Sequence, residues 1–516
     1  MAAIHIENCY LTVDGREPNS LEEALLLPDA AKYKEAFWKE ADGLIENETW
    51  DWCECPSDIV PIDTREVFVR KIQPDGSILV KARIVARGFT QVAGQNFSWD
   101  TIYAPVIRQS SIRWMFCLIA EHDLIVTQSD VTQAFLQADL KESADETTGE
   151  HLKDIIVRLP KAVWKQCPIT GRSLKYGRLQ KALYGLKQSP KRWNVKFNTG
   201  MTKFGFHTNP ADPCIYVLVS GNDFIIVGVY VDDLIKISNC QPLLDHVEKY
   251  MSTTFKIVHM GVLNQFIGMQ CSWKYTKDGR KYYNVSQKDY ALKILKRFKL
   301  DGCNATDAPC DTSKSGEARV LRPNPEDASL CNPTLLTDYR AMEGGLIYLS
   351  CLTRLDISYA VGACAVFMSN PTEEHMTALK RIFRYVIGTL DYSLKYFQTG
   401  EPIKLEMAVD ANFMGTYNSK STTGYLSYTP AGIVNYKSKR QSTVATATAH
   451  SETLAFFAAI RSLVLERRSA KGFKIIEHTD DHATIVFCDN TATIYWKLCF
   501  LFLVDNFKCI LLLLLT

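Results

Sequence analysis

The sequence predicts an α+β protein of several domains. Segments with helical spacing of apolar residues alternate with segments of strand-type residues along 516 residues, and no repeat of fixed period is visible. At about 150 residues per domain, this length implies two to four domains. Hydrophobic residues make up 47% and charged residues 22% of the chain, which is ordinary globular composition. A disordered chain, a collagen-like fibre and a small disulfide scaffold are thereby excluded.

The cysteines indicate a reducing environment. Sixteen of them are scattered without a C-x-x-C motif, and the first ten residues lack the charged-then-apolar pattern of a secretory signal. We therefore expect reduced thiols in an intracellular protein, in the cytoplasm or nucleus, that is not secreted.

The near-zero net charge of 59 − 57 = +2 conceals strong segregation. Residues 1–60 carry 14 acidic and 4 basic side chains, whereas residues 161–207 carry 11 basic side chains and no acidic one. Such a basic run repels itself unless an anion neutralises it, and phosphate backbones are the usual partner. Aromatic residues interleave with these charges, as on surfaces that bind nucleic acid. A solvated basic face is the alternative interpretation.

Apolar spacing and turn residues define the elements in order. In the first third of the chain we expect a helical segment over 18–50 and two strands within 64–90, which flank a turn at 74–76. A buried helix over 111–121 and a short strand ending at Asp130 follow. After Asp130 we expect a helix-like stretch and then an exposed loop at 141–150. Next come strands at 215–219 and 224–238, helices over 242–256 and 286–299, and a proline-containing linker over 301–337. Helices over 338–368 (in pieces) and 372–388 follow, then strands from 403, a helix near 450–468 and a strand at 484–488.

Two adjacent carboxylates interrupt the apolar stretch 224–238. Asp232 and Asp233 lie where its two strands meet, and like charges there are costly because each raises the other's pKa. A divalent cation removes that cost, and oxygen ligands suit Mg²⁺. Asp130, at the end of another strand, supplies the third carboxylate that such a site needs. A plain hairpin turn is the alternative for the Asp-Asp pair taken alone.

Eight motifs in a fixed order give the chain a family resemblance. They include YKEAFWKEADGLIENETW (33–50), VKARIVARGFTQ (80–91), QSDVTQAFLQADL (128–140), LQKALYGLKQSPKRW (179–193), VYVDDLI (229–235) and STTGYLSY (421–428). In this order the chain resembles the reverse transcriptase of copia-type LTR retrotransposons, as a fragment of the Pol polyprotein.

The resemblance implies a right-hand polymerase of fingers, palm and thumb over 61–300, preceded by an acidic helical lead-in at 1–60. A linker and helical connection at 301–400 and an incomplete RNase H-like α/β domain at 401–495 would follow. The apolar tail at 496–516 departs from the family, and we expect it to come from another reading frame or from flanking sequence. Its apolar runs are shorter than the ~20 residues of a bilayer span, so no membrane partner is expected.

The implied activity is that of an RNA-directed DNA polymerase acting on an RNA template, a DNA primer and dNTPs. Asp130, Asp232 and Asp233 would hold two Mg²⁺ ions, with Mn²⁺ as the alternative ion. Phe135 stands where such polymerases place an aromatic gate against the ribose 2′-hydroxyl, and an ordinary core phenylalanine is the alternative. A catalytically inactive relic that only binds nucleic acid is the competing hypothesis for the whole chain. The oligomeric state is not predicted.

Further binding residues follow from the same resemblance. Tyr184 and Gly185 would line the nucleotide pocket, the glycine by allowing close backbone approach. Lys81 and Arg83, together with Arg87, would share one strand face and clamp the triphosphate, with a solvent-exposed face as the alternative. Nucleic-acid contacts are expected from one basic group: Lys181, Lys187, Lys191 and Arg192.

The C-terminal part resembles the RNase H domain of the same polyproteins. Asp410, Glu452 and Asp489 would hold metal ions in a second centre, and ordinary caps and turns are the alternative. Asn412 replaces an acidic residue of the family, His450 stands where a glutamate is common, and the family's closing acidic segment has no counterpart after residue 492. The resemblance therefore leaves the RNase H activity undecided.

Overall fold

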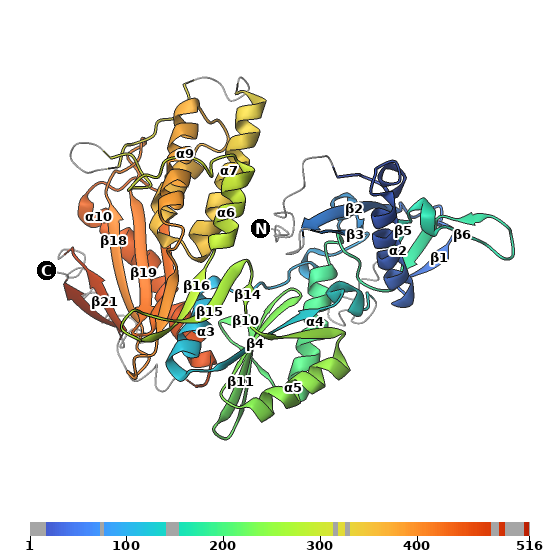
Figure 1. Cartoon of the computed structure of the whole chain (residues 1–516), viewed down its shortest axis with the longest axis horizontal. Coiled ribbons are helices and arrows are strands. Elements are labelled where there is room, and N and C mark those ends of the chain that lie inside the picture. Colours follow the sequence, from blue (N-terminus) through green and yellow to red (C-terminus); the bar gives the residue numbers. More distant parts are fainter. Residues whose placement is uncertain are drawn as a thin grey trace. The chain divides into compact units, whose positions relative to one another are not determined.

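The computed structural model describes residues 17–72, 77–140, 154–312, 318–325, 331–475, 484–490 and 510–514 (Figure 1). The chain divides into two compact units. Unit 1 comprises Met1–Val106, Asp130–Gly205 and Lys249–Val258, and unit 2 comprises Ile107–Ser129, Phe206–Glu248 and His259–Thr516. Among the described residues, no helix combines the length and apolarity needed to cross a bilayer.

Unit 1 is built on a five-stranded sheet. Its strand order is β1 (Trp50–Cys53), β8 (Tyr176–Leu179), β5 (Ile156–Arg158), β2 (Ile62–Ile72) and β3 (Ile78–Ala86). Around it lie α1 (Leu21–Ala24), α2 (Ala30–Glu46), the hairpin of β6 (Lys165–Gln166) and β7 (Ser173–Leu174), and α4 (Ser189–Phe204). Short 3-10 turns complete it: η2 (Gly88–Thr90), η3 (Trp99–Thr101), η4 (Ala134–Gln137) and η5 (Lys161–Val163).

The apolar stripe of α2 explains why the first helix covers this sheet. Tyr33, Phe37 and Leu44 recur at helical spacing, and all three are fully buried in one core with Ile84 of β3. Burial of each such side chain stabilises the fold by roughly 1.5–3 kcal/mol. The predicted helical segment 18–50 is confirmed, but it is divided into α1 and α2 around Pro28, which has no amide hydrogen to continue a helix.

The first sheet of unit 2 has six strands in the order β13 (Ile257–Val262), β4 (Ile125–Val131), β12 (Asp233–Ser238), β11 (Asp223–Tyr230), β10 (Asp212–Ser220) and β9 (His207–Asn209). The division between the units crosses β4, β13 and helix α5 (Gln241–Thr254). Helix α3 (Gln109–His122) belongs to unit 2. β11 is buried from Phe224 to Val229, so side chains on both of its faces are covered.

A second sheet of unit 2 joins distant segments. Its order is β14 (Gln265–Phe266), β15 (Met269–Tyr275), β16 (Lys281–Ser286) and β17 (Leu394–Phe397). Beside it, α6 (Lys288–Arg297), α7 (Pro333–Leu352), α8 (Ser358–Ala365) and α9 (Glu373–Gly388) share one hydrophobic core, with the 3-10 turn η7 (Leu355–Ile357) between α7 and α8. β17 comes from the predicted connection segment and pairs with β16, about a hundred residues earlier.

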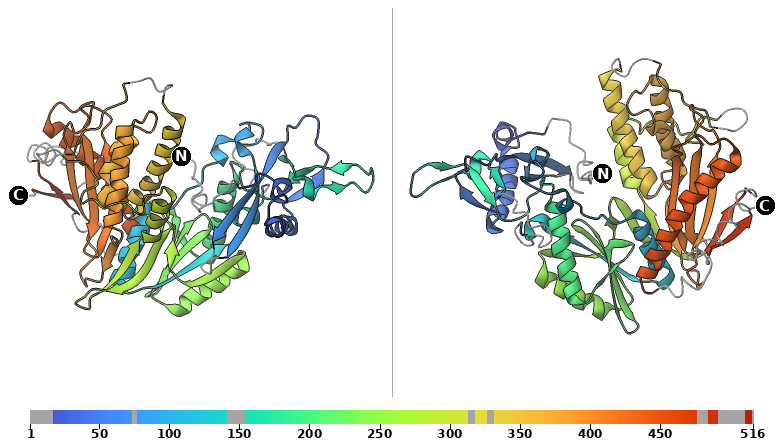
Figure 2. Two further views of the ribbon diagram at one scale, coloured as in Figure 1. Left: turned by 45° about the horizontal axis from the view of Figure 1, so that its top comes forward. Right: turned by 180° about the vertical axis from the view of Figure 1, so that it is seen from behind.

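The third sheet of unit 2 has the order β20 (Gly432–Arg440), β19 (Thr422–Thr429), β18 (Glu406–Asn412), β21 (Thr484–Cys488) and β22 (Ile510–Leu514). β20, β19 and β18 are antiparallel, whereas β21 runs parallel to β18. Helix α10 (Thr448–Gly472) packs against β18 and β19 (Figure 2). The predicted strand at 484–488 is β21.

One difference from the sequence-based expectations has a local cause. The helix-like stretch after Asp130 forms only η4, because Gln133 before it is left-handed (φ 50°) and Ala138 after it is extended. Residues 510–514 of the tail pair with β21 as the fifth strand of a sheet, and the origin of the tail from another reading frame or from flanking sequence stays a prediction. The predicted turn at 74–76, the loop at 141–150 and residues 496–509 and 515–516 of the tail lie outside the described residues.

Candidate active sites

The Asp232–Asp233 pair lies at a tight hairpin turn. β11 and β12 are antiparallel with Tyr230 opposite Asp233, so only Val231 and Asp232 form the turn. Val231 has a φ of 59°, in the left-handed region that β-branched residues avoid at a cost of about 1–3 kcal/mol. Asp232 is half-buried and Asp233 is exposed. This strained turn therefore presents two carboxylates to solvent at the end of a buried hairpin.

The charges at this turn act on the neighbouring tyrosine. The pKa of Tyr230 is raised, first by burial and then by the negative charges of Asp233 and Asp232. The phenol therefore keeps its proton at neutral pH and can serve as a hydrogen-bond donor.

Asp130 is the next-to-last residue of β4, and it is half-buried. β4 and β12 are neighbours in the sheet order. The division between the units falls between Ser129 and Asp130, which assigns Asp130 to unit 1 and the hairpin turn to unit 2. The convergence of the three carboxylates on one metal site stays a prediction.

Three predicted nucleotide-binding residues form a row within unit 1. The rings of Phe135 on η4 and Tyr184 lie with their centroids 5.0 Å apart and their planes at 58°. The guanidinium carbon of Arg83, on β3, is 5.1 Å from the centroid of the same Tyr184 ring. Phe135 is only 3% exposed, whereas Tyr184 and Arg83 are half-buried. This row could present a cation, an aromatic face and a steric wall to a nucleotide.

Backbone pairing brings these side chains together. The Ala86 amide donates to the Tyr184 carbonyl at 2.7 Å, and the Ala182 amide donates to the Ala138 carbonyl at 2.8 Å. Gly185 follows with a φ of 91°, and a Cβ at that position would collide with the Ala86 carbonyl oxygen. The close approach expected of Gly185 is thus made by the chain's own backbone at the end of β3.

The other two predicted clamp residues are placed differently. Lys81 is exposed and lies two residues before Arg83 on β3, so the two share a strand face. Arg87 follows the last residue of β3 and precedes η2. The expectation that all three share one strand face is wrong for Arg87, because β3 ends at Ala86.

The basic run is partly neutralised within unit 1. Lys181 forms an ion pair with Asp139, which lies opposite it in an isolated β-bridge. Other ion pairs join Lys161 to Glu22 (3.1 Å), Arg172 to Glu54 (3.9 Å) and Arg178 to Asp154 (3.2 Å). The acidic lead-in thus supplies some of the anions that the basic run needs. Asp139 neutralises the charge of Lys181, whose role as a phosphate contact stays a prediction.

The remaining basic candidates lie close to or on α4. Lys187 Nζ donates to the Gln91 carbonyl at 3.0 Å and lies 4.4 Å from the centre of the Phe97 ring. Lys191 and Arg192 are in the first turn of α4 and are half-buried. Positive side chains in the first turn oppose the helix dipole, and an external anion there would relieve that cost.

A second acidic centre lies entirely within unit 2, and the structure brings its three predicted carboxylates together. Asp410 is on β18, Asp489 follows β21, and these parallel neighbours end at the same edge of the sheet. Glu452 is in the first turns of α10, which packs on β18, and its Oε1 accepts a hydrogen bond from the Ala411 amide at 3.2 Å.

Glu452 is buried and is repelled by the negative charges of its two neighbouring carboxylates. This side chain is 7% exposed, and its pKa is raised to about 7, first by burial and then by the charges of Asp410 and Asp489. Its Oε2 has no hydrogen-bond partner among the described residues. A buried oxygen without a partner beside two further carboxylates fits a divalent cation with oxygen ligands.

The sequence did not single out Cys488 as a member of this centre. Its Sγ and one oxygen each of Glu452 and Asp489 all lie within 4.8 Å of one another. The available signal was its position as the last residue of a predicted strand, directly before Asp489. The two family departures make other contacts: Asn412 Nδ2 donates to the Tyr359 hydroxyl at 3.5 Å, and His450 Nδ1 accepts from the Thr446 amide at 3.4 Å.

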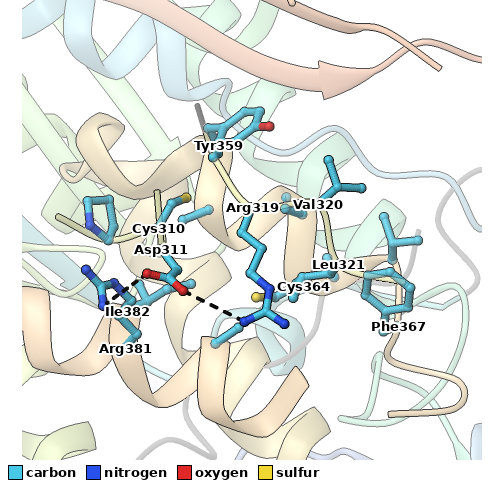
Figure 3. Close-up of a pocket in the computed structure, with 18 of the residues that line it drawn as sticks. Cys310, Asp311, Arg319, Val320, Leu321, Tyr359, Cys364, Phe367, Arg381 and Ile382 are labelled. Atoms are coloured by element: carbon cyan, nitrogen blue, oxygen red, sulfur yellow. Dashed lines mark ion pairs between the residues drawn. The ribbon is translucent and has the colours of Figure 1, made fainter. Parts of the chain in front are cut away.

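Unit 2 has a large cavity of about 870 Å³, and none of the predicted site residues line it (Figure 3). Residues of α8, α9, β19, β20 and the segment around 309–321 line it. Asp311 forms ion pairs across its wall with Arg319 (3.9 Å) and Arg381 (3.8 Å). The cavity is thus distinct from both carboxylate sites.

Comparison with known proteins identifies the family of this chain. The family model for reverse transcriptase (RNA-dependent DNA polymerase) matches residues 47–312, which is 266 of 516 residues. The chain is 32% identical over 497 residues to the retrovirus-related Pol polyprotein from transposon TNT 1-94 of Nicotiana tabacum, which covers 94% of this chain and 34% of that protein. It is 30% identical over 471 residues to the Pol polyprotein from transposon RE2 of Arabidopsis thaliana, covering 90% of this chain and 30% of that one.

The chain therefore spans about a third of the length of these relatives. Among solved structures, the prototype foamy virus protease-reverse transcriptase matches at 14% identity over 99% of this chain and 58% of that chain, with a TM-score of 0.24, which supports no statement about the fold. The family match covers Asp130, Phe135, Tyr184 and the Asp232–Asp233 turn. The chain belongs to the reverse transcriptase family, among the Pol polyproteins of copia-type retrotransposons.

Proposed function

We propose that this chain is an RNA-directed DNA polymerase that adds deoxynucleotides to the 3′-hydroxyl of a DNA primer on an RNA template. The observation that carries the proposal is the strained turn at Val231, which exposes Asp232 and Asp233 within the part of the chain that the family model covers. Strain of this kind persists where the surrounding fold maintains a functional geometry. The sheet from β9 to β13 would be the palm, and the sheet of unit 1 the fingers.

Asp130, Asp232 and Asp233 would hold two Mg²⁺ ions, since carboxylate oxygens are the ligands that this ion prefers. Bound there, the ions would lower the pKa of the primer hydroxyl and stabilise charge on the leaving pyrophosphate. Arg83 and Lys81 would bind the triphosphate from one face of β3. The Tyr184 ring would contact the base, and Phe135 would exclude a 2′-hydroxyl by its bulk.

Primer extension on an RNA template with Mg²⁺ and labelled dNTPs tests this proposal. Asp232→Asn keeps the size of the side chain but removes its charge, so we expect incorporation to fall by about 100-fold or more. The matched control is Asp223→Asn, at the opposite end of the same hairpin, where Asp223 pairs with Ser220. No incorporation by well-folded wild-type protein would instead favour the inactive relic that only binds nucleic acid.

A second activity is proposed for unit 2, namely RNase H cleavage of the RNA strand of an RNA–DNA hybrid. Its support is the meeting of Asp410, Glu452 and Asp489 at one sheet edge, with a buried, unpartnered Glu452 oxygen. These residues would hold the Mg²⁺ ions, which when bound would activate the attacking water.

Cleavage of a hybrid with labelled RNA in the presence of Mg²⁺ tests this second activity. Glu452→Gln should lower the cleavage rate about 100-fold or more, while the oxygen that accepts from Ala411 is kept. Glu466→Gln is the matched control, because Glu466 is also a buried glutamate of α10 with an unpartnered Oε2, but its Oε1 accepts from Asn435 and Ser462 and no other carboxylate raises its pKa. Equal rates for wild type and Glu452→Gln would contradict the assignment.

A further inference from the structure

Cys488 adds a sulfur ligand to the acidic centre of unit 2. We propose that Cys488, Glu452 and Asp489 form a mixed thiolate–carboxylate site that binds a thiophilic divalent cation such as Zn²⁺ more tightly than Mg²⁺. The inference shares two carboxylates with the proposed RNase H centre, but it does not require that centre to be active.

The backbone explains how three ligands reach one point. β21 ends at Cys488, which is fully buried, and the exposed Asp489 follows directly. Glu452 lies over the neighbouring strand β18 and is fixed there by the Ala411 amide. One ligand atom from each of the three side chains lies within 4.8 Å of the other two. Ligands around a tetrahedral Zn²⁺ are about 3.3–3.8 Å apart, given Zn–S of about 2.3 Å and Zn–O of about 2.0–2.2 Å, so small side-chain adjustments suffice.

An independent observation indicates that this cluster is built for a cation. Glu452 is 7% exposed, and its Oε2 is buried without a hydrogen-bond partner in the described part of the chain. An ionised carboxylate without a partner in the interior costs several kcal/mol unless a cation compensates it or the group takes up a proton. The charged groups that act on Glu452 are Asp410 and Asp489, and both are negative.

The thiol decides which cation binds best. Mg²⁺ is a hard ion that prefers oxygen and keeps its waters, whereas Zn²⁺ binds thiolate sulfur strongly. Binding would form a Zn–S bond and release the Cys488 thiol proton to solvent. A water molecule or a further carboxylate would complete the four ligands. Zn²⁺ at this position would compete with Mg²⁺ for Glu452 and Asp489.

Titration of the reduced, metal-stripped full chain with Co²⁺, a spectroscopic substitute for Zn²⁺, tests the site. A thiolate ligand produces a thiolate-to-Co²⁺ charge-transfer absorption, and we expect this band in the presence of excess Mg²⁺ and its loss on addition of Zn²⁺. Cys488→Ala should weaken binding about 100-fold and remove the band, because loss of even an outer partner of a ligand costs about 10- to 100-fold. The matched control is Cys271→Ala, another buried cysteine of unit 2, whose Sγ donates to the Met269 carbonyl.

Two further variants keep the test decisive if Cys488→Ala does not fold. Glu452→Gln and Asp489→Asn leave the thiol in place, and each should weaken Co²⁺ binding about tenfold or more. The proposal is wrong if these variants bind as wild type does, if excess Mg²⁺ abolishes the band, or if folded Cys488→Ala keeps it. Failure of Mg²⁺-dependent RNA cleavage would leave the Co²⁺ result unaffected, so the two proposals can fail separately.

Discussion

The ring of Phe135 lies against the ring of Tyr184, with centroids 5.0 Å apart, and Arg83 lies 5.1 Å from the same tyrosine. Because Phe135 is also 3% exposed, its ring has little freedom to move aside. A gate that excludes one hydroxyl group needs this rigidity, since a mobile ring would admit the larger sugar.

Replacement of this ring should relax sugar selection. We expect Phe135→Val to raise the incorporation of ribonucleotides relative to deoxynucleotides about 10- to 200-fold, the range that a hydrophobic steric contact supplies. Single-nucleotide primer extension with matched rNTP and dNTP measures the ratio. Phe68→Val, which removes a buried ring that packs on Tyr33, is the control for a general loss of packing in unit 1. An unchanged ratio in folded Phe135→Val would make Phe135 an ordinary core residue.

Two lysines of the basic run should differ in their effect on nucleic-acid binding. Lys191→Ala should weaken binding to all sequences alike and reduce the slope of log K against log salt by about 0.9, the contribution of one phosphate contact. Lys181→Ala should leave the slope unchanged, because Asp139 already neutralises Lys181. Binding of an RNA–DNA hybrid at several salt concentrations checks both. Equal slopes for wild type and Lys191→Ala would remove α4 from the interface.

Glu343 should destabilise the helical core of unit 2. This α7 side chain is fully buried, and neither carboxylate oxygen has a hydrogen-bond partner among the residues described. We expect Glu343→Met, which keeps the shape but removes the polar atoms, to stabilise the protein by about 1–3 kcal/mol at pH 7. Thermal unfolding of both proteins measures the difference. The control is Glu373→Met on α9, an exposed position where we expect a change within about 0.5 kcal/mol.

The benefit of Glu343→Met should grow with pH. Burial raises the pKa of Glu343 from 4.5 to about 8, so between these values the unfolded chain has lost a proton that the folded chain keeps. The stabilisation of the folded state that comes from its keeping this proton is therefore fully present below pH 4.5, and it is lost as the pH rises through 8. Thermal unfolding of wild type and variant from pH 5 to pH 9 should show a difference in stability that increases with pH. A difference that stays constant would mean that the Glu343 carboxylate has a hydrogen-bond or ionic partner.

Lys236 should be the most sensitive charged position of the six-stranded sheet. It is fully buried, forms an ion pair with Glu248, and donates to Ser129 Oγ at 2.6 Å. Lys236→Met leaves Glu248 without its main cation, and we expect a loss of about 3–5 kcal/mol. The double variant with Glu248→Leu should recover much of this loss, because the uncompensated charge is gone. Thermal unfolding of the two single variants and the double variant gives the coupling free energy between Lys236 and Glu248. If the losses of the two single variants simply add in the double variant, the predicted coupling is wrong.

Most elements could be predicted from the sequence, because local spacing records which face of a helix or strand is apolar. The strand 484–488 is β21, and helix 372–388 corresponds closely to α9. The position of Asp489 directly after its strand followed from the same pattern, whereas Asp410 lies within β18. The helix expected after Asp130 was wrong, since one left-handed residue, Gln133, limits it to η4.

The sequence by itself determined the family, the order of the elements and the residues able to supply carboxylates, since these depend on residue type and short-range spacing. Only the tertiary structure decided which distant groups meet: Lys181 with Asp139, Cys488 with Glu452, and β17 with β16. It also decided that Glu343 is buried without a partner. The local spacing of apolar residues does not predict which residues far apart in the sequence come into contact, because those contacts depend on how whole sheets and helices pack.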